Sequence, residues 1–556
     1  MAEAASVGER SVDRCGWAAL AAVLALGAQP ALGAERAAAA SGVDPQTINA
    51  IADQGFNHGQ VVETAEYLAD RIGGRMTNSP AMRQAEAWTQ AQFKAWGLTN
   101  VRLQPFDFGR GWWIERASVR MAEPRPLQLK GIPVAWTPPT DGPITAPIVV
   151  APLRMARDFA AWRGKLKGKI VLVSLPTAAR DETKAAFQRL SDADIARLDS
   201  YREPSFDPEN AARQAERVRF RRQLDAFLAQ EGALAAVSMS RSDGRLVHGE
   251  GSGYKVGQTP LVPAVELAAE DYRRLARLAK GGEVKLEIDS RVHFDDSNPN
   301  ANNILADIPG ADPKAGYVMA GAHLDSWVAG DGATDNGAGS AVVMEAARIL
   351  AALHVKPKRT IRFALWAGEE EGLLGSFAYV NQYLATRPPG DPKMADMGPY
   401  YASETYPVKP LPGFAEMVGY FNLDNGSGKI RGIYAEGNFA ATPVLKEWLA
   451  PFASLGASTV VAEPTGSTDH VFLAKVGLPA FQFIQDPLDY ESRTHHTDLD
   501  TFDHMRPDDL RQAAVILAAV LLDAANSETP LPRNVLPTQP RTTNPFNYPD
   551  PTRNGG

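Results

Sequence analysis

The chain has 556 residues and a formal net charge of −8, with 57 Lys and Arg against 65 Asp and Glu. This length exceeds what one hydrophobic core normally serves, so we expect two folded units with tails. The charge balance offers no positive surface of the kind that nucleic acids or other polyanions need, and we expect no nucleic-acid partner.

The N-terminus has the order of residues that is typical of a secretory signal. Two arginines precede an apolar run at 17–26, and small residues follow at 31–34. We predict a signal peptide over residues 1–34 and a secreted or periplasmic mature protein; a soluble Ala-rich helix is the alternative. No apolar run is long enough to span a bilayer, so we expect no stable membrane insertion. The only cysteine, Cys15, lies in this segment, so a metal site in the mature chain must use His and carboxylates.

Residues 44–126 have the pattern of α/β structure without a site of their own. Ser79 and Pro80 predict the start of a helix, because Ser is a good N-cap and Pro is accepted in the first turn. Gly97 predicts the end of that helix, and a strand is expected from Val101 to Phe106. We assign this segment to the N-terminal part of the main domain.

Residues 127–298 have a different pattern of apolar and charged residues. Short β runs such as 170–173 and the alternating 284–288 surround a charged helical stretch, 181–230, and we find no constellation of metal ligands or nucleophiles here. We predict a small β-rich inserted domain that ends in a linker at 295–299.

Residues 299–528 repeat a pattern of strand, loop and helix. This pattern predicts an α/β fold in which a mostly parallel central sheet is flanked by helices. Residues 529–556 are rich in Pro, Asn and Thr, and we expect an extended or disordered tail.

Four apolar runs of this last part each lead to potential metal ligands. They are 317–322 before His323 and Asp325, 361–366 before Glu369 and Glu370, 418–423 before Asp424, and 479–484 before His495 and His496. A further carboxylate, Asp335, lies in a Gly-rich loop. In open α/β sheets, ligands bind beyond the carboxyl ends of the strands. Each residue alone is typical of a turn or a helix cap, but the coincidence of four strand ends predicts a metal site.

These motifs resemble one family of enzymes. The residues that carry the resemblance are His323-Leu324-Asp325, Asp335-Asn336-Gly337-Ala338-Gly339, the run 369–376, Asn422-Leu423-Asp424 and His496-Thr497. They are similar to the co-catalytic zinc exopeptidases of the bacterial leucine aminopeptidase type, and 421–434 and 466–497 are most similar to the carboxypeptidase Q (plasma glutamate carboxypeptidase-like) branch. The resemblance implies a zinc exopeptidase fold with an inserted protease-associated domain, and hydrolysis of short peptides by an aminopeptidase or a dipeptidase.

The resemblance also implies two Zn²⁺ ions per chain. Asp335 would bridge the two ions. His323 and Asp424 would complete one site, and Glu370 and His496 would complete the other. Each ion then has three protein ligands and an open position, as catalytic zinc requires.

Two further residues receive catalytic roles from the resemblance. Glu369 would be the general base, and Asp325 would orient the imidazole of His323. His495 remains an alternative to His496, and Asp331 an alternative to Asp335.

Substrate recognition is less determined by the sequence. Ser467 stands where the aminopeptidase branch has a tyrosine, so His470 or Tyr490 is a candidate donor to the substrate, and Arg493 is a candidate anchor for a carboxylate. The end of the peptide that is recognised, the side-chain preference and a homodimer all stay open. The competing functions are a single-zinc aminoacyl cyclase and a catalytically inactive binding or receptor-type relative.

Overall fold

The computed structural model describes residues 43–198, 210–394 and 397–539. The predicted signal peptide at 1–34 and the predicted tail beyond residue 539 lie outside the described residues. Among the described helices, none combines the length and the apolar character that a membrane crossing needs.

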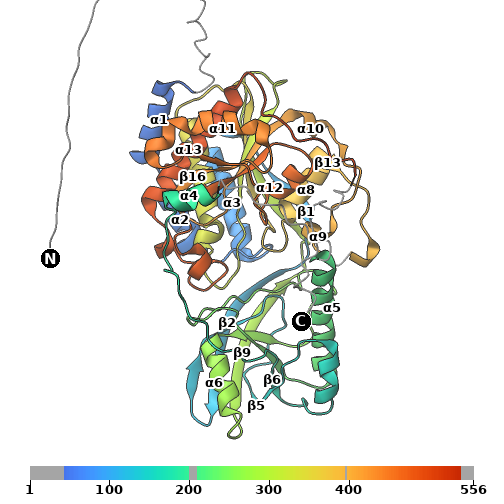
Figure 1. The fold of residues 1–556 in the computed structure, drawn as a ribbon. Coiled ribbons are helices and arrows are strands. Elements are labelled where there is room, and N and C mark those ends of the chain that lie inside the picture. Colours follow the sequence, from blue (N-terminus) through green and yellow to red (C-terminus); the bar gives the residue numbers. More distant parts are fainter. Residues whose placement is uncertain (1–42, 199–209, 395–396, 540–556) are drawn as a thin grey trace, which may run out of the picture. The chain divides into compact units, whose positions relative to one another are not determined.

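The larger part of the described chain is built on a mixed eight-stranded sheet (Figure 1). Its strands, in spatial order, are β1 (Thr99–Asp107), β10 (Asn300–Ile308), β12 (Thr360–Trp366), β11 (Tyr317–His323), β15 (Met417–Asn422), β18 (Ala480–Gln485), β16 (Ile430–Tyr434) and β17 (Thr459–Val461). The neighbours β12, β11, β15 and β18 are parallel. Antiparallel pairs attach β10 and β1 on one side and β16 on the other. The predicted α/β fold with a central sheet is confirmed, and its parallel strands occupy the middle.

Alternate residues of these strands face two different helical layers, as the period of a strand requires. Val318, Ala320 and Ala322 of β11 belong to the core on one side, whereas Tyr317 and Met319 belong to the core on the other. The first layer contains α1 (Pro45–Phe56), α2 (Val61–Glu66), α3 (Pro80–Ala95), α7 (Ala338–Ala352), α11 (Thr442–Leu449) and α13 (Pro507–Asn526). The second contains α8 (Leu374–Tyr379), α9 (Pro399–Ala402), α10 (Pro412–Glu416), α12 (His470–Lys475) and the short pair β13 (Ala385–Thr386) and β14 (Lys409–Pro410).

Helix α3 begins as the sequence predicts. Ser79 is the N-cap, and its hydroxyl accepts a hydrogen bond from the backbone N–H of Met82, while Pro80 occupies the first helical position. The helix ends at Ala95, and Gly97 follows with a φ of 84°, a conformation that favours glycine.

A second eight-stranded sheet forms within the middle of the chain. Its strands, in spatial order, are β3 (Leu127–Leu129), β2 (Gly111–Glu123), β9 (Lys285–Asp295), β5 (Ile144–Val150), β6 (Ile170–Leu172), β7 (Ala235–Met239), β8 (Ala264–Leu267) and β4 (Gly131–Pro133). The helices of this part are α4 (Asp192–Leu198), α5 (Asn210–Gln230) and α6 (Ala269–Leu278). Because β2 pairs along its length with β9, the second sheet already begins at Gly111, upstream of the predicted boundary at 127.

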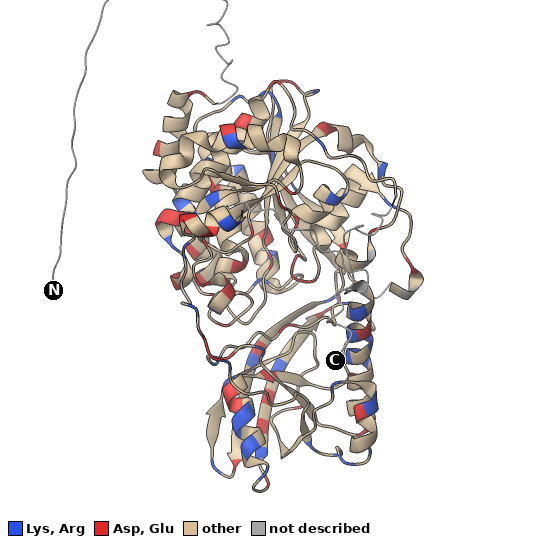
Figure 2. Cartoon of the chain, in the orientation of Figure 1, with Lys and Arg blue, Asp and Glu red and all other residues tan. Residues whose placement is uncertain are grey.

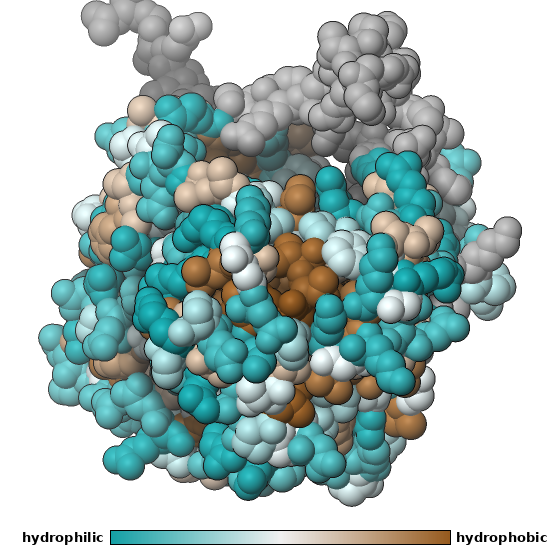
Figure 3. All heavy atoms as spheres, turned by 90° about the horizontal axis from the view of Figure 1, so that it is seen from below, coloured by the Kyte–Doolittle hydropathy of each residue, from teal (hydrophilic) through white to brown (hydrophobic). Residues whose placement is uncertain are grey.

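Helices α5 and α6 pack on opposite faces of this second sheet. Phe227 of α5 shares a core with Val171 of β6, whereas Leu275 of α6 shares a core with the neighbouring Ile170 and Leu172. Both helices carry several Lys, Arg, Asp and Glu positions, and so do the long strands of the second sheet (Figure 2). Seen from below, the surface is mostly hydrophilic around an apolar patch (Figure 3).

The described part of the predicted tail, 529–539, contains no helix or strand. It is nevertheless fixed to the main domain, because the backbone N–H of Asn534 donates to the carbonyl of Gly477 and the backbone N–H of Val408 donates to the carbonyl of Pro537. Leu531 is buried in the same core as α7 and α13. Up to residue 539 the tail is therefore extended and packed.

Candidate active site

Three neighbouring parallel strands deliver acidic and imidazole side chains to one edge of the first sheet. β11 ends at His323, β12 leads into Glu369 and Glu370, and β15 leads into Asp424. The strands lie side by side in the order β12, β11, β15, so their carboxyl ends meet.

His323, Asp335 and Asp424 form a buried cluster. Nε2 of His323 lies 3.3 Å from Oδ1 of Asp335 and 3.2 Å from Oδ1 of Asp424. One possible ligand atom from each residue lies within 4.8 Å of those of the other two. Nδ1 of His323 lies 2.9 Å from the backbone carbonyl oxygen of Asp325, which can only accept, so Nδ1 carries a proton and Nε2 is the ring atom that could bind a metal ion.

A second cluster uses the other oxygen of Asp335. Nε2 of His496 lies 3.2 Å from Oδ2 of Asp335 and 3.0 Å from Oε2 of Glu370. The two oxygens of Asp335 therefore face two different histidines, each accompanied by one further carboxylate. This is the arrangement that a bridging carboxylate between two metal ions requires.

The structure also places the two alternative residues. His495 lies with its Nε2 3.8 Å from Oδ2 of Asp335, and its ring packs between those of Tyr490 and His496. It can join Asp335 and His496 in a group of possible ligands, but only His496 also contacts Glu370. Asp331 is half-buried outside both groups of ligands.

The loop that carries Asp335 is held by two buried side chains that the sequence did not single out as functional. Asp500 accepts hydrogen bonds from the backbone N–H groups of Thr334 and Asp335, at 2.6 Å and 3.1 Å, and from the Thr334 hydroxyl. The guanidinium of Arg75, which is fully buried, donates to the backbone carbonyl of Gly332 at 2.6 Å. Together they fix the conformation in which both Asp335 oxygens reach the histidines.

The carboxylate of Asp325 contacts the turn that carries the two glutamates. Its Oδ1 lies 3.8 Å from Nδ1 of His323, which instead contacts the Asp325 backbone carbonyl. The Asp325 carboxylate accepts the backbone N–H of Glu369 at 3.3 Å and that of Glu370 at 3.2 Å. The predicted link from Asp325 to His323 is thus made by the main chain.

The crowding of carboxylates fits a metal centre. Burial raises the pKa of Glu369 well above its usual range, and repulsion from Asp424 and Glu370 adds to this. Although burial acts in the opposite direction, nearby carboxylates raise the pKa of His323 and that of His496 well above the usual range. The site therefore favours positive charge, which a bound metal ion would supply.

Two buried carboxylate oxygens of the site add to this argument. Oδ2 of Asp335 and Oε1 of Glu370 accept no hydrogen bond of good geometry. Buried polar atoms are rarely left without a partner in folded proteins, and metal coordination is one way to satisfy them. A set of imidazole and carboxylate donors is also the set that catalytic zinc accepts.

Glu250 contacts the site and was not predicted from the sequence to do so. Its Oε1 lies 2.8 Å from Nδ1 of His496, and it also accepts a hydrogen bond from Arg241 at 2.6 Å. Burial alone would raise the pKa of Glu250, but these two contacts lower it to about 2. The Gly-rich context of Glu250 was visible in the sequence, but its proximity to His496 arises only on folding.

The predicted substrate-binding residues lie in different surroundings. Tyr490 is buried beside His495, with their ring centroids 4.8 Å apart. His470 is fully buried at the start of α12, with its Nε2 3.2 Å from Oε1 of Glu436. Arg493 is exposed in the turn that precedes the two histidines.

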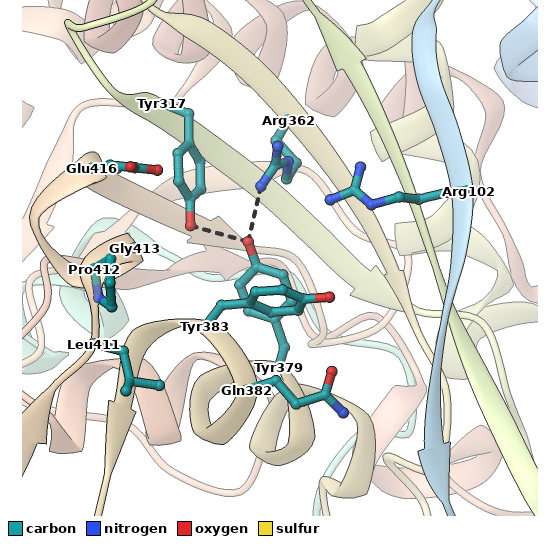
Figure 4. A pocket seen from close by; sticks show the side chains of 10 residues that line it. All are labelled: Arg102, Tyr317, Arg362, Tyr379, Gln382, Tyr383, Leu411, Pro412, Gly413 and Glu416. Carbon is teal, nitrogen blue, oxygen red and sulfur yellow. Dashed lines mark hydrogen bonds between the residues drawn. The ribbon is translucent and has the colours of Figure 1, made fainter.

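A separate cavity of about 370 Å³ lies at the other end of β11 (Figure 4). Tyr317, the first residue of β11, and Tyr379 join their hydroxyls there at 3.0 Å, and Arg362 donates to the Tyr379 hydroxyl at 3.1 Å. Tyr317, Tyr379 and Arg362 are linked by these two hydrogen bonds, and the lining of the cavity contains none of the residues of the clusters described above.

Comparison with known proteins points to one family of peptidases. Residues 303–521 match the model of peptidase family M28. Carboxypeptidase Q of Bos taurus is 26% identical over 480 residues, which cover 85% of this chain and 86% of that protein.

Solved structures share the fold. The Peptidase M28 precursor from Shewanella amazonensis superposes with a TM-score of 0.61 at 24% identity, covering 89% of this chain and 99% of that one. BSAP, a zinc aminopeptidase from Bacillus subtilis, superposes with a TM-score of 0.54 at 22% identity, covering 84% and 95%. The resemblance predicted from the motifs is confirmed, and the match to the M28 model and the carboxypeptidase Q relatives support a peptidase.

Proposed function

We propose that this M28 peptidase is a di-zinc exopeptidase that hydrolyses short peptides. The observation that carries the proposal is the placement of Asp335. Its Oδ1 faces His323 and its Oδ2 faces His496, and each histidine contacts a further carboxylate, Asp424 or Glu370.

These five side chains would hold the metal. His323, Asp335 and Asp424 would bind one zinc ion, and Asp335, Glu370 and His496 would bind the other. When bound, zinc supplies a Lewis acid that makes water acidic enough to attack at neutral pH and polarises the scissile carbonyl.

Glu369 is the residue left for proton transfer. Its neighbour Glu370 is directed to His496, whereas Glu369 lies close enough to Asp424 and His323 to interact with their charges. Asp325 holds the backbone N–H groups of both glutamates, so the two carboxylates keep separate directions. Glu369 would accept a proton from the attacking water and pass it to the leaving amine.

We favour dipeptides as substrates, on the similarity to carboxypeptidase Q. A dipeptidase must accept a free amine and a free carboxylate, and Arg493 is the exposed cation nearest in sequence to the His496 ligand. A panel of dipeptides with the amine blocked, the carboxylate blocked, or neither blocked tests this choice. Hydrolysis that tolerates a blocked carboxylate but not a blocked amine would instead make the enzyme an aminopeptidase.

Two further assignments belong to this proposal. The second sheet, whose strands run in the chain from β2 to β9, would be the inserted protease-associated domain, although the segment predicted for that domain, 127–298, leaves out β2. The protein would be exported by its N-terminal signal and act outside the cytoplasm. A single-zinc cyclase or an inactive relative is disfavoured, because all five predicted ligands come together.

A further inference from the structure

The two histidines of the candidate zinc centre are oriented by different parts of the chain. Nδ1 of His323 faces the carbonyl of Asp325, two residues along the same segment. Nδ1 of His496 faces Oε1 of Glu250 at 2.8 Å, and Glu250 lies between β7 and β8 of the second sheet. The ring of His323 is thus held by its own segment, whereas the ring of His496 is held by a residue from the second sheet.

The loop that carries Glu250 packs closely against neighbouring backbone. A Cβ on Gly251 would lie 2.1 Å from the carbonyl oxygen of Ala135, and Gly249 has a φ of 69°. Glu266 of β8 braces the same loop, because its carboxylate accepts the backbone N–H of His248 at 3.0 Å. These contacts give Glu250 a defined position although its side chain is 31% exposed.

The loop that carries His496 is joined to the second sheet at further points. The backbone N–H of Val247 donates to Oδ1 of Asp498 at 3.0 Å, and the backbone N–H of Asp498 donates to the carbonyl of Val247 at 3.1 Å. Lys130 forms an ion pair with the same Asp498. The approach of Glu250 to His496 is therefore part of a continuous contact.

We propose that Glu250 is a positioning residue through which the second-sheet unit orients the zinc ligand His496. A carboxylate that accepts the Nδ1 proton holds the ring in the tautomer that presents Nε2 to the metal, and it increases the basicity of that nitrogen. The proposal rests on the di-zinc function proposed above. It assigns to the second-sheet unit a direct contribution to one of the two metal sites.

The test is a zinc titration of the metal-stripped mature protein against a competing chelating dye, for the parent chain and three variants. For Glu250→Ala we expect the affinity for one of the two zinc ions to fall by about 10–100-fold, the usual effect of losing such a partner, with the other unchanged. Glu250→Gln keeps an acceptor oxygen and is expected to recover most of the lost affinity.

Glu115→Ala is the matched control. Glu115 is a half-exposed carboxylate that contacts His293 within the second sheet, and it is absent from every contact of the candidate site described above. It is expected to bind zinc as the parent does. The thermal midpoint of each metal-free variant, compared with that of the metal-free parent, separates a folding defect from a metal-binding defect.

Wild-type affinity for both ions in a folded Glu250→Ala variant would overturn the inference and leave the di-zinc proposal intact. So would an equal loss in the alanine and glutamine variants, because the glutamine keeps the acceptor. A parent chain that binds fewer than two zinc ions would overturn the proposed function, and the inference with it.

Discussion

The carboxylate of Asp325 accepts the backbone N–H of Glu369 at 3.3 Å, and that of the following residue at 3.2 Å. A residue two positions after the end of β11 thereby holds the turn after β12. Two adjacent glutamates can then serve different purposes, because the main chain between them is not free to rotate.

We predict that Asp325→Ala reduces kcat/KM by about 10–100-fold, because the turn loses its acceptor while every proposed ligand remains. Asp325→Asn keeps one acceptor oxygen and is expected to lose less. Asp331→Asn, in the neighbouring loop but outside the clusters, is the control and should match the parent. Steady-state kinetics on one dipeptide decides this, and an Asp331 variant more impaired than both Asp325 variants would contradict the account.

Substitutions at the two glutamates are expected to separate metal binding from proton transfer. Glu369→Gln should keep both zinc ions and lose about 10²–10⁴-fold in kcat with little change in KM, because an amide cannot accept the proton at neutral pH. Glu370→Gln should lose zinc together with activity. Zinc content measured beside kcat decides the matter, and loss of zinc by the Glu369 variant alone would mean that the two roles are reversed.

A part of this site could be predicted from the sequence when its residues lie close together along the chain. Each strand end could be recognised because an apolar run is followed by polar residues within a few positions, as with His323 and Asp424. Glu250 could not be recognised, since it is 246 positions from His496 and nothing local distinguishes it from a solvated loop carboxylate.

The same limit applies to what the sequence predicts about the fold. The parallel centre of the first sheet was predicted because its strands are buried on both faces and appear as continuous apolar runs. Strand β2 was missed because it is only partly buried and carries charges such as Arg116 and Arg120, so it did not mark the start of the second sheet. The role of the Asp325 side chain in orienting His323 stays a prediction, and the hydrogen bond to the Asp325 main chain could not be read from the position of this residue in the sequence.

The stability of the fold should depend on pH through Asp523. This residue is 4% exposed near the end of α13 and accepts the backbone N–H of Val43. Burial, with repulsion from Glu447, raises the pKa of Asp523 from its usual 3.8 to about 7. The folded state therefore binds this proton more tightly than the unfolded chain, so the stabilisation is complete below about pH 4 and is lost as the pH rises through about 7.

We predict that Asp523→Asn, which cannot ionise, becomes progressively more stable than the parent over this range, by a few kcal/mol at most. Urea denaturation at pH 5 and pH 8 measures the difference. Asp508→Asn, an exposed carboxylate on the same helix, is the control and should follow the parent. Parallel pH profiles for the parent and the Asp523 variant would contradict the prediction.

Export is expected to leave a defined N-terminus. We predict that the native protein begins between residues 31 and 35, after cleavage at the small-residue stretch. N-terminal sequencing of protein isolated from its source measures this, and a purified native chain that retains residues 1 to 30 would refute the assignment.

The di-zinc proposal requires Asp335 to bridge two zinc ions, and zinc-edge anomalous diffraction from crystals of the zinc-loaded protein locates the ions. We predict two peaks about 3.5–4 Å apart on either side of the Asp335 carboxylate. One peak would be shared with His323 and Asp424, and the other with Glu370 and His496. A single peak, or two peaks that do not both contact Asp335, would contradict it.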